Sequence, residues 1–212
     1  MIPPRTTRRQ GFTLIELLTV IAIVGVLAAI VISTVSTVRS KARITRCLSN
    51  MRQAGVAFSL YAGDNRNTLP TQKTDGVPLT NSASWPAQLS PYVSDFRMLL
   101  CTESNPVHPY PNVSYIYNSF ASRFSAPTKP PVKVTEAQNP AQAIVLLDTS
   151  NTNNTDKAYI ITNVDVSATQ SQLLPHPVGS TPRQSRSVLF LDGHVAMVKK
   201  GELSWRQLQW PQ

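Results

Sequence analysis

The sequence predicts an α+β protein in which one long N-terminal helix packs on a small antiparallel sheet. None of its 17 prolines lies between Arg5 and Leu69, so this stretch is compatible with an unbroken helix. Beyond it, short β-branched runs alternate with proline-rich and polar stretches, as in a small sheet with many turns. Apolar residues make up 42% of the 212 residues and charged residues 15%, which argues against both wholesale disorder and a multi-span membrane protein.

The N-terminus reads as a basic leader at 1–11 followed by an apolar run, with no charged residue between Glu16 and Arg39. About 20 apolar residues cross the ~30 Å hydrocarbon core of a bilayer, so we expect a transmembrane helix at 12–38. A buried core helix and a cleaved signal peptide share parts of this pattern, although the apolar region of a signal peptide is usually shorter. The charges that lead the run would place the N-terminus in the cytoplasm. They are Arg5, Arg8 and Arg9.

One acidic residue, Glu16, stands inside the apolar stretch, four residues after Phe12. A carboxylate in a bilayer costs roughly 3 kcal/mol or more, so it usually has a partner and a role. The alternative is that Glu16 lies near the interface, reaches headgroup water and has no specific partner.

The segment from Gly11 through Phe12 to Glu16 resembles the processing and methylation motif of type IV pilins and type II secretion pseudopilins. The resemblance implies that a prepilin peptidase of the membrane cleaves after Gly11 and methylates the new amine of Phe12. It also implies that the apolar helix stays on the mature protein. Glu16 would then accept a charge-paired hydrogen bond from the amine of a neighbouring subunit during assembly, which would offset the desolvation of both charges.

The helix is predicted to continue as an amphipathic stem at 39–63, because apolar residues recur at spacings of three and four and Gly63 offers a stop. The pattern does not say whether this stripe faces the chain's own globular domain or another surface. A basic cluster runs from Arg39 to Arg52 on the outer side of the span, where it would contact neighbouring subunits or membrane lipid. No nucleic-acid recognition motif or interleaved aromatic residue accompanies it, so nucleic acid is not an expected partner.

The remainder, 64–212, is predicted to form a periplasmic α+β domain. Asp192-Gly193 between Ser187–Leu191 and Val195–Val198 predicts a hairpin with a two-residue type I′ turn. Further strands are expected at 114–120, 143–147 and 158–164.

Landmarks in this region are similar to a pilin-associated domain named for a His, nine residues, and then Asp-Gly. They include Leu100-Cys101, Ser114 to Asn118, and Val188 to Val195. The match is divergent, because the nearest upstream histidine is His176 and Pro182 stands at the expected place. No role for His176 is therefore carried over.

The two cysteines, Cys47 and Cys101, would both lie outside the inner membrane, where disulfides persist. They would either form a disulfide, which ties the following loop to the helix, or remain two separate buried thiols.

No catalytic motif is present, and the expected function is structural rather than enzymatic, with no cofactor. Calcium is a weak candidate ligand, because no spacing selects any of the acids that could hold it. These acids are Asp148, Asp156, Asp165 and Asp192.

The resemblance implies a pilin-like subunit, in the first place a type II secretion pseudopilin. Its expected partners are the prepilin peptidase, other pilin subunits and an inner-membrane assembly platform. A type IV minor pilin, used for adhesion, motility or DNA uptake, is the second candidate. The third is a membrane-tethered glycan-binding protein, suggested by its aromatic residues Trp85, Tyr92, Tyr110, Tyr115 and Tyr117.

Overall fold

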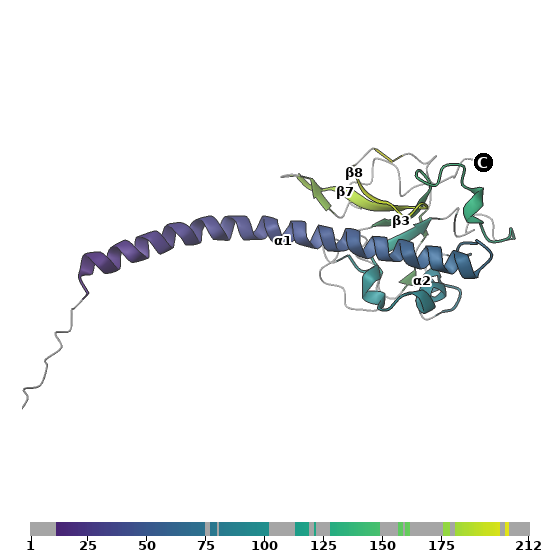
Figure 1. Cartoon of the computed structure of the whole chain (residues 1–212), viewed down its shortest axis with the longest axis horizontal. Coiled ribbons are helices and arrows are strands. Elements are labelled where there is room, and N and C mark those ends of the chain that lie inside the picture. Colours follow the sequence, from purple (N-terminus) through teal and green to yellow (C-terminus); the bar gives the residue numbers. More distant parts are fainter. Residues whose placement is uncertain are drawn as a thin grey trace, which may run out of the picture. The chain divides into compact units, whose positions relative to one another are not determined.

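The computed structural model of the chain describes residues 12–74, 77–79, 81–101, 113–118, 121, 128–148, 157–158, 160–161, 176–178, 181–199 and 202–203. The chain divides into two compact units, 1–41 and 42–212. Helix α1 (Leu14–Asp64) begins in the first unit and ends in the second (Figure 1), which agrees with the helix predicted at 12–63.

In the first unit, α1 has the length and composition of a membrane-spanning helix. None of its most apolar window is buried within the protein, and the described side chains from Phe12 to Ile32 are exposed to solvent. This exposure distinguishes the run from the buried core helix of a soluble domain, which was one of the structures that the sequence left open.

The second unit contains the predicted sheet. Four strands pair antiparallel in the order β2 (Tyr115–Asn118), β3 (Ile144–Asp148), β7 (Thr181–Phe190) and β8 (Val195–Lys199). The short strand β6 (His176–Val178) also pairs antiparallel with β7, so His176 lies in the sheet opposite Ser185. The α+β fold with a small antiparallel sheet is therefore confirmed.

The pairings at the periphery are more varied than the sequence predicted. Strand β5 (Ile160–Ile161) lies parallel to β2, so one edge of the sheet is mixed. Strands β1 (Val77–Pro78) and β4 (Lys157–Ala158) form a separate antiparallel pair. Two-residue strands carry too little periodicity to be recognised in a sequence.

The β7–β8 hairpin is present, but its predicted type I′ turn is wrong. The backbone N–H of Phe190 donates to the carbonyl of His194 at 3.0 Å, which leaves three residues in the connection rather than two. A type I′ turn needs two residues with positive φ, whereas here Gly193 has φ of +88° and Asp192 is not in that region. The Asp192 carboxylate instead accepts the backbone N–H of His194 at 3.0 Å, which holds the longer connection in place.

The described part of the second unit also contains four short helices: α2 (Trp85–Leu89) and the 3-10 helices η1 (Ser90–Tyr92), η2 (Phe96–Leu99) and η3 (Val134–Glu136). Ser84 caps α2 by accepting the backbone N–H of Ala87 at 3.3 Å, and Pro86 stands in its first turn. A serine followed by a proline in this arrangement is a helix-start signal.

The core of the second unit lies between α1 and one face of the sheet. The buried helix residues Cys47, Met51 and Phe58 cluster with residues of the sheet and of α2. Figure 1 shows β3, β7 and β8 on one side of this part of α1 and α2 on the other. Because the same stripe of the helix packs against the chain's own domain, the structure answers the question that the amphipathic pattern left open. The partners include Leu69, Trp85, Leu89, Tyr115, Tyr117, Val145 and Leu189.

Candidate processing and assembly segment

The N-terminal end of α1 is closed by a reciprocal hydrogen-bond pair between Thr13 and Glu16. The backbone N–H and the hydroxyl of Thr13 donate to Glu16 Oε2 at 2.9 and 2.8 Å. The backbone N–H of Glu16 donates back to Thr13 Oγ1 at 3.3 Å. This is a capping box, and it fixes the start of the helix at Leu14.

The capping box leaves Phe12 outside the helix, with 82% of its surface exposed. The backbone that follows the expected cleavage site is therefore free of helical hydrogen bonds at Phe12. Gly11 and the basic leader lie outside the described residues, so the cleavage site itself is a sequence expectation.

The Glu16 carboxylate is exposed, and its own chain uses only part of its capacity to accept hydrogen bonds. Both hydrogen bonds from Thr13 end on Oε2, and among the described residues none ends on Oε1. A carboxylate can accept about four hydrogen bonds. The geometry therefore leaves acceptor capacity for an ammonium group of another molecule.

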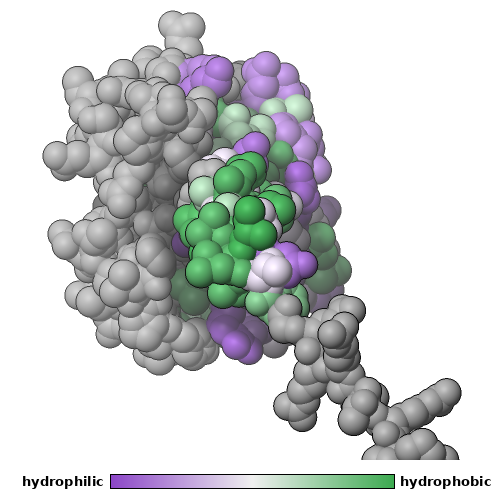
Figure 2. Space-filling view, turned by 90° about the vertical axis from the view of Figure 1, so that its left-hand side faces the viewer, coloured by the Kyte–Doolittle hydropathy of each residue, from purple (hydrophilic) through white to green (hydrophobic). Residues whose placement is uncertain are grey.

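The helix that carries this carboxylate presents an apolar surface. Figure 2 shows a contiguous patch of hydrophobic residues bordered by hydrophilic ones, and the described side chains of the N-terminal part of α1 are exposed. Its exposed large side chains include Leu18, Ile21 and Val24. Such a surface is stable in a bilayer or against other helices rather than in water.

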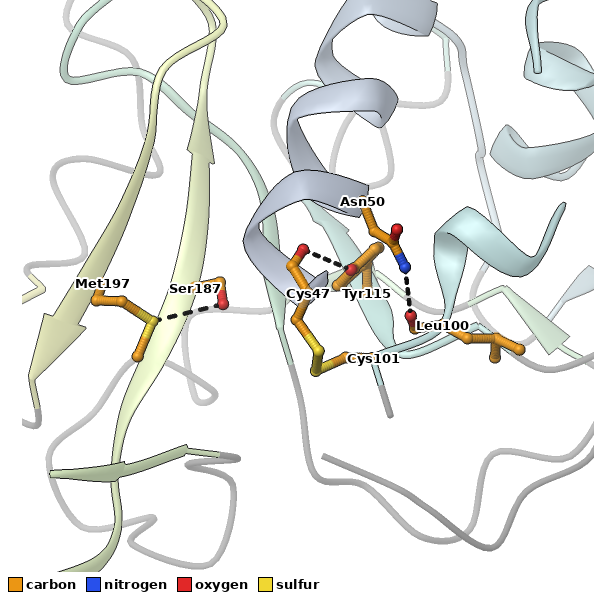
Figure 3. The surroundings of a disulfide bond; sticks show 7 residues. All are labelled: Cys47, Asn50, Leu100, Cys101, Tyr115, Ser187 and Met197. Carbon is orange, nitrogen blue, oxygen red and sulfur yellow. Dashed lines mark hydrogen bonds between the residues drawn. A yellow bond between two sulfur atoms is a disulfide. The ribbon is translucent and has the colours of Figure 1, made fainter. Parts of the chain in front are cut away.

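A second feature lies in the globular unit, where Cys47 and Cys101 form a disulfide (Figure 3). Each cysteine is 1% exposed. The bond joins α1 to the chain that follows η2 and closes a loop with a sequence separation of 54 residues.

Two hydrogen bonds reinforce this junction, as Figure 3 shows. The side-chain amide of Asn50 donates to the carbonyl of Leu100 at 3.1 Å. The hydroxyl of Tyr115 donates to the carbonyl of Cys47 at 3.2 Å. One turn of α1 is thereby attached to two separate parts of the domain.

The four acids considered for calcium do not gather in the part of the chain that the structure describes. Asp148 is buried in β3, whereas Asp192 is in the β7–β8 connection, with its Oδ1 2.6 Å from the ring Nδ1 of His194. Asp156 and Asp165 lie outside the described residues. Within the described ranges, no group of three His, Cys, Asp or Glu side chains has a metal-binding arrangement.

The aromatic residues considered for glycan binding are mostly structural. Trp85, Tyr115 and Tyr117 are fully buried, and Trp85 and Tyr117 lie in a cluster with Phe58. Tyr92 is half-buried and its hydroxyl donates to Asp64 at 3.0 Å, while Tyr110 lies outside the described residues. Buried rings cannot stack on a sugar without unfolding the core.

The sequence reasoning missed Thr13, although the signal was present. A threonine followed at the third position by glutamate, directly before an apolar run, is the capping-box pattern. Glu16 therefore has a local structural role as well as the assembly role that the resemblance implies.

The comparisons agree with the interpretation of this segment. Residues 6–32 match the family model of the prokaryotic N-terminal methylation motif. No curated protein and no solved structure matches the chain with significant similarity. The match covers the end of the leader, the residues around the expected cleavage site, the capping box and the exposed apolar part of α1. The N-terminal segment is therefore a prepilin-type methylation motif, which supports the resemblance to type IV pilins and pseudopilins.

Proposed function

We propose that this chain is a pilin-like structural subunit of a bacterial inner membrane and a pseudopilin of a type II secretion apparatus. A prepilin peptidase cleaves it after Gly11 and methylates Phe12. The apolar part of α1 then holds it in the membrane as a single span, with the disulfide-bonded domain on the periplasmic side. From there an assembly platform adds it to a filament. The subunit itself catalyses no reaction.

The observation that carries this proposal is the exposed Glu16 carboxylate at the start of an exposed apolar helix, within a matched methylation motif. The cleavage would create a positively charged amine on Phe12, four residues away. Placing a paired amine and carboxylate in a bilayer costs less free energy than placing each charge there alone. Stacking of subunits would therefore bring the amine of one subunit to the carboxylate of the next.

Two observations in the globular unit favour a structural subunit outside the cytoplasm over a glycan-binding protein. The aromatic side chains best suited to glycan binding, including Trp85 and Tyr117, are used in the core. The disulfide at Cys47 is suited to an oxidising compartment outside the cytoplasm.

The assembly role is tested by Glu16→Ala in cells that express the full chain. We expect the variant to remain in the membrane fraction after carbonate extraction, while covalent cross-linking no longer yields the ladder of higher oligomers seen with the native chain. A Ser49→Ala variant, changed at an exposed position of the same helix, is the control and should assemble normally. A native ladder from Glu16→Ala would contradict the role of the carboxylate.

The secretion assignment has its own test, a deletion of the gene. Loss of enzyme secretion, with surface pili retained, is the expected result. Incorporation of the chain into pili sheared from the cell, with secretion intact, would show a minor pilin instead.

A further inference from the structure

We propose that the first turns of the α1 stem bind anionic phospholipid headgroups of the outer leaflet through the arginine face, which consists of Arg39, Arg43 and Arg46. This inference rests on the membrane span of the proposed function. It assigns a lipid class to a surface that assembly through Glu16 does not use.

The arginine face follows from helix geometry. Its three residues recur at i, i+4 and i+7, so they lie on one side of the helix. All three side chains are exposed. The buried stripe of α1 begins with Cys47 and continues through Met51, so the domain's core leaves Arg39 and Arg46 accessible.

The position along the chain places this face at headgroup depth. The charge-free run ends at Val38 and Arg39 follows at once. Because the transmembrane helix predicted at 12–38 ends at Val38, the residue that follows it, Arg39, would lie among the headgroups of the outer leaflet. Basic clusters directly beside a span attract anionic lipids.

The chemistry of the side chains suits a phosphate partner. Arginine presents a planar fork of donors that matches phosphate oxygens in pairs, and its long stem can lie along the acyl boundary. No ion pair recorded among the described residues involves Arg39 or Arg46.

The alternative partner is an acidic surface of another subunit. Lipid is favoured because the arginines follow the apolar run without a gap, so a bilayer that accepts the run meets them in every subunit, assembled or not.

The test compares lipid selectivity in membranes. The full chain is reconstituted into phosphatidylcholine vesicles that contain one-third phosphatidylglycerol. Electron paramagnetic resonance then gives the association constant of spin-labelled phosphatidylglycerol relative to spin-labelled phosphatidylcholine. We expect a preference of about threefold for the native chain, and a clearly smaller preference in the triple variant Arg39→Gln, Arg43→Gln, Arg46→Gln and at high salt.

A charge-matched control carries Lys73→Gln, Arg97→Gln and Lys129→Gln, all at exposed positions of the globular unit. It should keep the native preference.

The outcomes separate the two proposals. A chain that carbonate extracts from the vesicles overturns the membrane span and with it the proposed function. A chain that stays integrated but shows no lipid preference, or a control that loses the preference equally, overturns the arginine face alone. Subunit cross-links that form in pure phosphatidylcholine and vanish in the triple variant would show that another subunit is the partner, and would likewise overturn it.

Discussion

Gly55 of α1 lies so close to Leu189 of β7 that a Cβ atom at this position would come within 2.9 Å of Leu189 Cδ1. The same added atom would be 3.8 Å from the Cα of Gly193. Leu189 is 1% exposed and packs in the main core, so its side chain would have to shift within the core to accommodate the added atom. The glycine thus sets how closely the stem helix approaches the strand and the hairpin connection.

Replacing Gly55 with alanine is expected to destabilise the domain. Alanine improves helix propensity by about 1 kcal/mol, whereas overpacking a core costs about 1–3 kcal/mol, so the net loss is about 0–2 kcal/mol. Gly55→Val removes the propensity gain and should cost more. Urea unfolding followed by circular dichroism measures the free energy of unfolding.

The control is Gly63→Ala in the same helix, where nothing lies within 4 Å of the added Cβ. This variant should be neutral or more stable by up to about 1 kcal/mol. If Gly55→Ala stabilises the domain as much as Gly63→Ala, the close approach to Leu189 is not a constraint in solution.

Reduction of the Cys47–Cys101 disulfide is expected to weaken the domain substantially. A closed loop with a sequence separation of 54 residues corresponds to about 4 kcal/mol in the chain-entropy model. Guanidinium unfolding with and without reductant should show this difference. The double variant Cys47→Ala, Cys101→Ala should have the same unfolding midpoint with and without reductant. A native chain whose unfolding midpoint does not change on adding reductant would contradict the prediction.

The two buried tyrosines predict a loss of stability at alkaline pH. Burial raises the pKa of Tyr115 well above its usual value, with a further contribution from Asp148, and burial also raises that of Tyr117. Above pH of about 10 the unfolded chain loses phenolic protons that the folded chain keeps, so the free energy of unfolding falls as pH rises. The double variant Tyr115→Phe, Tyr117→Phe should flatten this slope between pH 9 and 11, measured by urea unfolding.

The single variants should differ at neutral pH. The Tyr117 hydroxyl donates to the buried carbonyl of Pro70 at 2.9 Å, whereas that of Tyr115 donates to Cys47 within a helix. Tyr117→Phe removes a partner that the Pro70 carbonyl needs and should cost about 1–3 kcal/mol, and Tyr115→Phe about 1 kcal/mol. Equal alkaline slopes in the native chain and the double variant would refute the assignment.

The cap and the charge of Glu16 can be separated. Glu16→Gln keeps an acceptor for the capping box but removes the negative charge, whereas Thr13→Val weakens the cap by about 1 kcal/mol and keeps the charge. We expect Glu16→Gln to abolish the cross-linked ladder and Thr13→Val largely to preserve it. The reverse pattern would mean that Glu16 acts through helix capping alone.

Much of the fold could be predicted because its signals are local. The proline-free stretch to Leu69, with Gly63 near its end, predicted α1, and the apolar run Ser187–Leu191 predicted the C-terminal part of β7. The prediction of a type I′ turn at Asp192 was wrong because the Asp192 carboxylate accepts a hydrogen bond from the backbone N–H of His194. This bond outweighs the usual preference of Asp-Gly for a type I′ turn. The parallel pairing of β5 with β2 depends on contacts distant in sequence, which no local pattern encodes.

The candidate site could be predicted where its residues lie close together in the sequence. Gly11, Phe12 and Glu16 form a contiguous motif, so sequence alone could nominate them. The burial of Trp85 and Tyr117 could not be predicted, because aromatic residues occur both in protein cores and on ligand-binding surfaces.

The central claim is that the chain is cut after Gly11 and retains its apolar helix. Intact-mass spectrometry of the protein purified from native membranes tests it most directly. The account predicts a chain that begins at Phe12 and carries one methyl group on its amine. A chain that still contains residues 1–11, or one cleaved beyond Val38, would contradict it.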